Sequence, residues 1–541
     1  MASSTFSREE LAQALEAVGI TAGSTVFSHS NIGYFGALQN GGGKQDYFDA
    51  IYGAFQDVLT ESGTLIVPTF TYSYCKGQDF SPDETPSTCG IFTEMIRLHT
   101  KALRSNEPIF SVAAIGPRAR ELTEDVGEEC FGQGSFWQRL LESGGIICNL
   151  NFDAGSTFIH YAERCLNVPY RYDKIFEGNL VGSAGKRKTR AIFYCQDLSN
   201  PNTVASFEPF DKLAREKSIV KTKKVGRGSL VSLTAQDTFS LIEHQLKIDP
   251  YFLTASAGQG RTVDLTLPQK SAPTALKIPS GCTIESLAEI LDQLPIATVS
   301  SNFDYALESL ADFMPLRIFS YPTGTRLADE IVPEQWQCLA CRLTDGAGEE
   351  ILSFDQDPHL VAFYSRSFKG SVSKEVLLDH LYVDDQNPDQ VPYRSVQNVP
   401  TWQLCARKST VAGLVGDTFT VSLETSTCFG SMQVGEYTAN NSTLPADIYY
   451  CAVGTRPRAW TEGLAAILAL KELESEAKLT RPSKVIIGTC RLALDLYLKN
   501  TAGQESVQTV SLIDAFCQQG TDNLQQTKDL LKQSLLRLPI T

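Results

Sequence analysis

Short apolar runs alternate with longer amphipathic stretches along about the first 250 residues, and this alternation restricts the fold more than any other feature of the sequence. The apolar runs have the length and content of buried strands. They are STVFSHS (24–30), GTLIVPTF (63–70), SVAAIG (111–116) and GIICNL (145–150). The stretches at 45–62 and 92–100 space their apolar residues as a helix does. Strands and helices that alternate along a chain predict an α/β domain.

Local signals at both ends of this region agree with that prediction. Ser7 is a candidate N-cap for an opening helix, because charged residues follow it and Leu11 and Leu15 recur at helical spacing. Two later runs, 189–196 and 226–234, predict a further strand pair.

The character of the chain changes near residue 260. Residues 261–280 are rich in Gly, Ser, Thr and Pro, which predicts a linker between domains at 1–260 and 281–541. The expected elements of the second domain are a helix at 284–294, a β-rich region at 330–440 with alternating runs such as HLVAFYS (359–365) and DTFTVSLET (417–425), and helices at 462–477 and 523–538.

Composition excludes several classes of protein. Of the 541 residues, 42% are hydrophobic and 20% charged, as in soluble globular proteins. The net charge of −15 argues against nucleic acid or an anionic membrane as the main partner, because such partners require basic patches. Fourteen scattered cysteines indicate free thiols in a reducing compartment. Without a signal peptide or a membrane-spanning run, we expect a cytoplasmic protein.

Hydroxyl groups follow two of the expected strands. Ser28, His29 and Ser30 end the first strand before a loop with two glycines, and Thr69 follows the proline that stops the second. Such groups can hold a carbonyl or phosphate oxygen, and they also mark ordinary turns. Ligands of open α/β sheets bind at the carboxyl ends of strands, so these residues are candidate ligand contacts.

A third polar segment lies between the second and third strands. It contains Arg104, Ser105 and, at the start of the third strand, Ser111. The guanidinium of Arg104 could pair with a phosphate or fix a loop.

His160 and Glu163 are three residues apart, which places both on one face of a helix. A carboxylate beside an imidazole fixes its tautomer and stabilises the imidazolium form. Such a pair could remove a proton from an amine, or it could be structural. The spacing differs from the helical motif in which two histidines bind zinc.

Five motifs connect these residues in order. They read SHSN at 28–31, GTLIVPT at 63–69, RSNEPIFS at 104–111, FGQGS at 131–135 and HYAE at 160–163, with VPYRYDKIFEG following at 168–178. In order and spacing they resemble the aminoglycoside 3-N-acetyltransferase family over about residues 5–255. Asn31 and Glu107 stand where many members have serine and histidine, which resembles the family's biosynthetic branch more than its resistance branch.

The resemblance implies an antibiotic N-acetyltransferase-like α/β domain and a direct transfer reaction. His160 would act as the general base and Glu163 would steady the imidazolium. Acetyl-coenzyme A would be the cosubstrate. Its implied contacts are Ser28, His29, Ser30, Thr69, Arg104, Ser105 and Ser111.

The second half resembles a bacterial aminopeptidase-like family. The matching pieces are YPTGT (321–325), VPEQW (332–336), 352–381, 391–405 and 430–436. The resemblance implies an α+β aminopeptidase-like region with a β-rich insertion. It could bind a substrate, cover the acyltransferase site or make an oligomer contact.

The metal ligands of that family do not carry over to this chain. Arg456-Pro457 stands where the family has His-Pro, and the acidic pair is missing. Cys338 and Cys341 are close in sequence but lack a second pair of ligands, so we expect a strand there. We therefore expect no bound metal.

Together these features predict an N-acyltransferase that moves an acetyl or other acyl group from coenzyme A to an amine of an amino sugar or secondary metabolite. One alternative donor is an acyl carrier protein thioester docked by the C-terminal half. A second alternative is a non-catalytic or hydrolytic aminopeptidase-like protein. The expected partner is a small-molecule amine, with no nucleic acid and no membrane, and a homo-oligomer could form.

Overall fold

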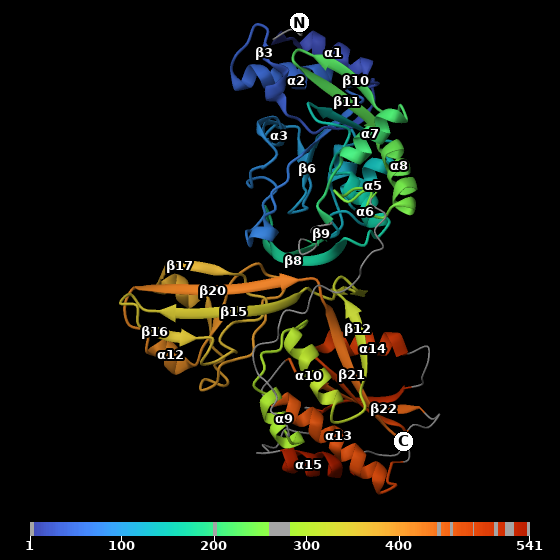
Figure 1. Cartoon of the computed structure of the whole chain (residues 1–541). Helices are drawn as coiled ribbons and strands as arrows, with labels where there is room; N and C mark the ends of the chain where they lie inside the picture. Colours follow the sequence, from blue (N-terminus) through green and yellow to red (C-terminus); the bar gives the residue numbers. More distant parts are fainter. Residues whose placement is uncertain are drawn as a thin grey trace. The chain divides into compact units, whose positions relative to one another are not determined.

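The computed structural model describes residues 5–197, 203–258, 282–440, 445–454, 458–479, 481–501, 507–513 and 524–537. Its chain divides into two compact units (Figure 1). Unit 1 comprises Met1–Asp264 with Asn398–Pro400, and unit 2 comprises Leu265–Gln397 with Thr401–Thr541. The predicted linker at 261–280 lies outside the described residues.

Unit 1 is built on a seven-stranded sheet with the strand order β10-β11-β7-β2-β4-β6-β5. Its central strands β7, β2 and β4 are parallel, and the outer strands are antiparallel to their neighbours. The strands are β2 (Thr25–Phe27), β4 (Thr64–Pro68), β5 (Leu103–Arg104), β6 (Val112–Ile115), β7 (Ile146–Leu150), β10 (Lys221–Val225) and β11 (Gly228–Thr234). The four apolar runs expected to be strands all form strands of this sheet.

Helices cover both faces of the sheet, as expected for an α/β domain (Figure 1). One apolar core joins alternate strand residues to α1 (Arg8–Ala17), α2 (Lys44–Leu59) and α3 (Ile91–Arg97). The core on the other face contains residues of α5 (Phe136–Glu142), α6 (Ile159–Cys165), α7 (Glu208–Glu216) and α8 (Ala235–Ile248). Ser7 caps α1, since its hydroxyl accepts a hydrogen bond from the Glu10 amide at 3.2 Å. The helices predicted at 45–62 and 92–100 are confirmed as α2 and α3.

The predicted strand pair at 189–196 and 226–234 is wrong in its partners. Residues 189–196 belong to β9 (Gly185–Gln196), which pairs with β8 (Arg171–Gly182) in a separate two-stranded ribbon. Residues 226–234 contribute β11, which pairs with β10 and β7. Each strand pairs with its neighbour across a short turn. Gly226 at φ +53° makes the turn before β11, where an added Cβ would lie 2.2 Å from the Phe35 carbonyl oxygen.

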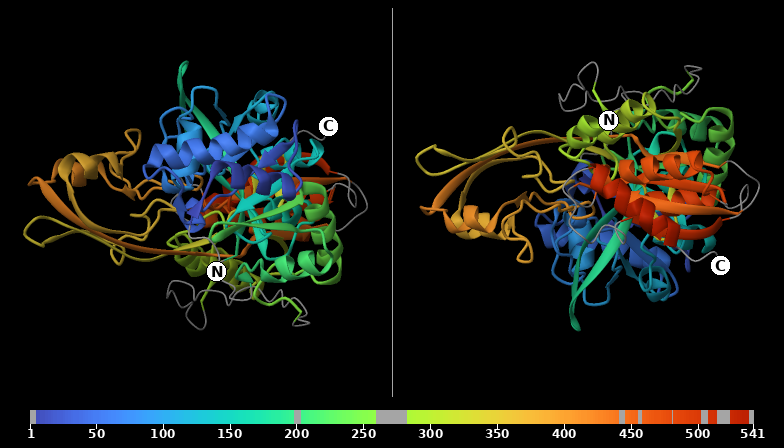
Figure 2. Two further views of the ribbon diagram at one scale, coloured as in Figure 1. Left: turned by 90° about the horizontal axis from the view of Figure 1, so that it is seen from above. Right: turned by 90° about the horizontal axis from the view of Figure 1, so that it is seen from below.

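Unit 2 contains a five-stranded mixed sheet with the order β12-β21-β23-β22-β24. Its strands are β12 (Arg317–Pro322), β21 (Ser431–Ala439), β22 (Ala446–Ala452), β23 (Ser483–Gly488) and β24 (Val507–Leu512). Its helices are α9 (Ile284–Leu291), α10 (Ser301–Ala311), α13 (Ala459–Ser475), α14 (Arg491–Thr501) and α15 (Leu524–Arg537). Helices α13 and α15 lie side by side (Figure 2). The helices expected at 284–294, 462–477 and 523–538 are therefore present.

A second sheet of unit 2 is antiparallel, with the order β16-β15-β20-β17. It comprises β15 (Gln335–Thr344), β16 (Glu350–Ser353), β17 (Phe368–Ser373) and β20 (Thr418–Cys428). Strand β20 alternates exposed and buried residues as its sequence predicts. The α+β class with a β-rich part is thus confirmed for this half.

The alternating run at 359–365 does not form a strand. Residues 360–364 are all buried, but the segment forms no continuous ladder with a neighbouring strand among the described residues. It makes only isolated bridges, from Val361 to Leu404 and from Phe363 to Ser395. Tyr364 at φ +68° ends the extended conformation, and its hydroxyl donates to the Glu334 carbonyl oxygen at 3.0 Å.

Within the described ranges, no helix is both long enough and apolar enough to span a bilayer. Cys338 and Cys341 lie in β15, as the sequence predicts. In the same ranges, no group of three or more His, Cys, Asp or Glu side chains is placed to hold a metal ion. Arg456 and Pro457, where the sequence comparison expected the metal ligands to be replaced, lie outside the described residues.

Candidate active site

Three of the predicted site residues of unit 1 lie at the carboxyl ends of neighbouring parallel strands. Strand β2 pairs with both β4 and β7 in parallel register. Ser28 follows β2 directly and Thr69 follows β4. Ser30 makes a parallel bridge to Leu150 at the end of β7. This edge is where open α/β sheets bind ligands.

His160 lies at the start of α6 and contacts Glu163 as its helical spacing predicts. The His160 Nδ1 lies 2.6 Å from the Glu163 Oε2. The Glu163 side chain is fully buried, and 17% of the His160 side chain is exposed. Rings of Phe131 and Phe207 pack on His160, with centroids 5.4 and 5.6 Å from it. With Nδ1 bound to the carboxylate, Nε2 is the nitrogen left for a proton acceptor.

Two residues that the sequence analysis did not assign a role complete this cluster. Tyr170 donates a hydrogen bond from its hydroxyl to the Glu163 Oε1 at 2.7 Å. The Arg171 Nε, at the start of β8, lies 2.8 Å from the Glu163 Oε2. A buried carboxylate requires such partners, and the Tyr-Arg pair seven and eight residues beyond Glu163 was the available signal for them.

The ionisation of the pair follows from its surroundings. Burial and the nearby Arg171 guanidinium lower the pKa of His160 below its usual value, although Glu163 opposes them. Burial alone would raise the pKa of Glu163, but His160, Arg171 and Tyr170 outweigh burial and lower it. The arrangement is therefore a carboxylate beside a neutral imidazole, which can accept a proton.

Thr157 connects His29 to the helix that carries His160. The His29 Nε2 is 3.3 Å from the Thr157 hydroxyl, and the Thr157 carbonyl oxygen accepts a hydrogen bond from the His160 amide at 3.1 Å. The His29 ring packs edge-on against Phe27, with centroids 5.0 Å apart. Burial lowers the pKa of His29 to about 4, so its imidazole is neutral near pH 7.

Thr69, Arg104 and Ser111 form one hydrogen-bonded group. The Thr69 hydroxyl donates to the Ser111 hydroxyl at 3.2 Å. Arg104 donates from Nε to the Thr69 hydroxyl at 3.0 Å and from Nη2 to its carbonyl oxygen at 2.7 Å. The Nη1 of Arg104 donates to the carbonyl oxygens of Pro82 and Thr85. The guanidinium therefore ties the end of β4 to a neighbouring loop.

The three remaining serines occupy different positions. Ser28 is fully buried, and its hydroxyl has a long contact of 3.5 Å with the His29 carbonyl oxygen. The Ser30 hydroxyl oxygen is buried and has no hydrogen-bond partner in the described part of the chain. Ser105 accepts a hydrogen bond from the Val112 amide at 3.0 Å and joins β5 to β6, so it lies outside the Thr69 group.

Glu107 is buried in the loop between β5 and β6. It accepts hydrogen bonds from the amides of Ile109 and Phe110 and from the Cys130 thiol. Burial raises the pKa of Glu107 to about 7 against these bonds. The Phe110 ring packs on Phe131, which also contacts His160.

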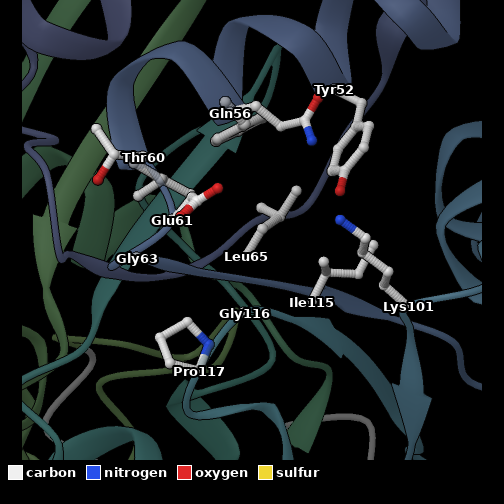
Figure 3. A pocket seen from close by; sticks show the side chains of 12 residues that line it. Tyr52, Gln56, Thr60, Glu61, Gly63, Leu65, Lys101, Ile115, Gly116 and Pro117 are labelled. Carbon is white, nitrogen blue, oxygen red and sulfur yellow. The ribbon is translucent and has the colours of Figure 1, made fainter.

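A cavity of about 700 Å³ lies elsewhere in unit 1, at the other end of β4. Tyr52 and Gln56 of α2 line one wall, Lys101 lies at its edge, and Leu65 and Ile115 form its apolar part (Figure 3). It contains none of the residues predicted for the active site.

Two families match parts of this chain. Residues 27–247 match the family described as aminoglycoside 3-N-acetyltransferase. Residues 335–426 match a family described as a domain of unknown function, DUF2172. Both matches fall within the regions for which the sequence motifs predicted relatives.

Individual relatives agree with this division. A Clostridium acetobutylicum polysaccharide biosynthesis protein with an aminopeptidase-like domain is 23% identical over 158 residues, which is 29% of this chain and 36% of the relative. Aminoglycoside N(3)-acetyltransferase VII of Streptomyces paromomycinus is 28% identical over 184 residues, which is 30% of this chain and 62% of the relative. The chain thus spans less than two thirds of either relative. These matches confirm the predicted resemblances of the two halves.

Among solved structures, a complex described as AAC-IIIb with CoASH matches 45% of this chain and 97% of its own. It is 22% identical, with a TM-score of 0.40.

Proposed function

We propose that unit 1 transfers an acetyl or other acyl group from coenzyme A to an amino group of an amino sugar or secondary metabolite, with His160 as the general base. The contact between the neutral His160 imidazole and the Glu163 carboxylate, 2.6 Å from Nδ1 to Oε2, carries the proposal. The family match over residues 27–247 supports the reaction class.

In the proposed reaction the amine nitrogen attacks the thioester carbonyl carbon directly. A nitrogen–carbon bond forms as the carbon–sulfur bond breaks, and the coenzyme A thiolate leaves. His160 Nε2 takes the proton that the nitrogen loses and passes it to the thiolate. Glu163 stabilises the imidazolium while it exists.

The carbonyl oxygen gains charge during the attack and requires hydrogen-bond donors. Ser30 is the first candidate, because its buried hydroxyl has no bond to any described residue. Ser28, His29 and Thr69 share the same edge of the sheet and are the proposed contacts of coenzyme A. Arg104, Ser105 and Ser111 would act behind them by fixing the ends of β4 and β6.

A thiol-release assay tests the proposal. The full chain is incubated with acetyl-coenzyme A and, one at a time, amino sugars and other primary amines. We expect free thiol and N-acetylated product that both depend on the amine. Release with a carrier-protein thioester but not with coenzyme A would favour the alternative donor, and release with neither would contradict the proposal.

A further inference from the structure

Glu163 is a fully buried carboxylate of the proposed site with several side-chain partners. One carboxylate meets three side chains: the His160 imidazole, the Tyr170 hydroxyl at 2.7 Å and the Arg171 guanidinium at 2.8 Å. The Glu163 side chain is fully buried, and only 5% of the Arg171 side chain is exposed. A fixed positive charge therefore lies beside the histidine–glutamate pair, away from water.

The positive charge of Arg171 determines whether His160 of the pair is protonated. A buried carboxylate with only an imidazole beside it favours the imidazolium, because the ion pair then has no net charge. An imidazolium cannot accept a proton from an amine. Arg171 already neutralises Glu163, so a second positive charge on His160 is disfavoured in the same small volume.

Among the described residues, the charged groups that act on His160 are Glu163 and Arg171. Glu163 acts on it from α6 and Arg171 from β8. Phe131 and Phe207, on the elements that pack against the ring, present aromatic groups. The neighbouring arginine of α6, Arg164, is partly buried; it pairs with Asp173 at 2.9 Å and contacts neither member of the pair in the described bonds.

The start of β8 holds Arg171 in place. Its Nη1 donates to the Tyr194 carbonyl oxygen at 3.3 Å, across the β8–β9 pairing. The Tyr194 hydroxyl in turn donates to the Val168 carbonyl oxygen at 3.1 Å. Arg171, at the start of β8, and Tyr170, the residue before it, are thus presented to α6 by the end of a long antiparallel ribbon.

We infer that Arg171 and Tyr170 are positioning residues that hold Glu163 as a carboxylate and leave His160 unprotonated, so that it can act as a base. Arg171 supplies the countercharge, and Tyr170 fixes the carboxylate oxygen that faces away from His160. The charge arrangement exists without substrate. Only the expected effect on the reaction rate rests on the proposed function.

The experiment is an NMR titration of the histidine rings in the full chain without substrate. The chain has six histidines, and the His160 signal is identified by its loss in His160→Asn. In Arg171→Met we expect His160 to titrate at a higher pH than in the wild type. Arg171→Lys keeps the charge and should restore most of the difference. Tyr170→Phe should shift the titration in the same direction by a smaller amount, since Glu163 loses one hydrogen bond.

Arg164→Gln is the matched control, because it removes a partly buried arginine of the same region that pairs with Asp173 instead of Glu163. It should leave the His160 titration at the wild-type pH. Unfolding curves of all variants establish that each is folded. An unchanged titration in folded Arg171→Met would overturn the inference.

The pH dependence of kcat/KM separates this inference from the proposed function. We expect the acidic limb of the profile to move to higher pH in Arg171→Met, together with the NMR titration. If the NMR signal moves and the kinetic limb does not, the charge coupling stands and His160 is not the base.

Discussion

The Arg104 guanidinium donates a hydrogen bond from Nη2 to the carbonyl oxygen of Thr69 at 2.7 Å. The sequence motif had made Arg104 a candidate contact of coenzyme A. Its remaining donors bond to the Thr69 hydroxyl and to the carbonyl oxygens of Pro82 and Thr85. Because Arg104 bonds to groups within the chain, we predict that its main role is to stabilise the fold and not to bind coenzyme A.

We expect Arg104→Gln to lower the free energy of unfolding of unit 1 by about 2–4 kcal/mol, because several carbonyl oxygens lose a charged donor. Urea denaturation measures the change. Arg120→Gln is the control, because Arg120 is 73% exposed and pairs with Glu124 within its own turn; it should cost under about 0.5 kcal/mol. Unchanged stability together with weaker coenzyme A binding would show that Arg104 contacts the cosubstrate instead.

Replacing His160 should remove the base without removing the binding site. In His160→Asn we expect the rate of amine acylation to fall by about 10²–10⁴-fold. Coenzyme A affinity, measured by calorimetry, should stay near the wild-type value. His244→Asn changes an exposed histidine of α8 and should leave the rate unaffected. Full activity in His160→Asn would refute the mechanism.

The fold was predictable where one residue pattern has one structural solution. The runs around Phe27, Ile66 and Ile147 are apolar on both faces, which suits only buried strands, and they form the centre of the sheet. Pairing partners were less predictable, since β-strand periodicity does not specify a neighbour. The run from His359 to Ser365 shows a second limit. An apolar composition is common to buried loops and buried strands, so it does not distinguish them.

The local part of the site was predictable and the non-local part was not. Helical spacing was sufficient to bring His160 and Glu163 into contact. The contact of Arg171 with Glu163 depends on how β8 returns to α6, which no local spacing encodes. Similarly, Arg104 could bind a phosphate or a loop on sequence grounds, and only its acceptors in the fold distinguish the two.

Glu107 should make stability depend on pH near neutrality. Burial raises its pKa from 4.5 to about 7 in the folded chain. Folding therefore takes up a proton between these pH values, so the free energy of unfolding should fall as pH rises through this window, by up to about 3 kcal/mol. Glu107→Gln cannot titrate and should lack this decline. Urea denaturation between pH 4 and about 8 measures the free energy of unfolding of both proteins. If the two free energies differed by the same amount at every pH, the raised pKa of Glu107 would be contradicted.

Unit 2 should contain no structural or catalytic zinc. A register shift in β15 between Cys338 and Ala340 turns both Cys338 and Cys341 inward. Burial raises the pKa of Cys341 to about 12 and raises that of Cys338 as well, so both thiols stay protonated, and zinc binds the thiolate. No third ligand stands near them within the described ranges.

We expect elemental analysis of the purified chain to find far less than one zinc ion per molecule. A chelator should leave the thermal unfolding curve unchanged, because no folding energy comes from a metal. Stoichiometric zinc, or a lower unfolding temperature with the chelator, would show that this half keeps a metal site.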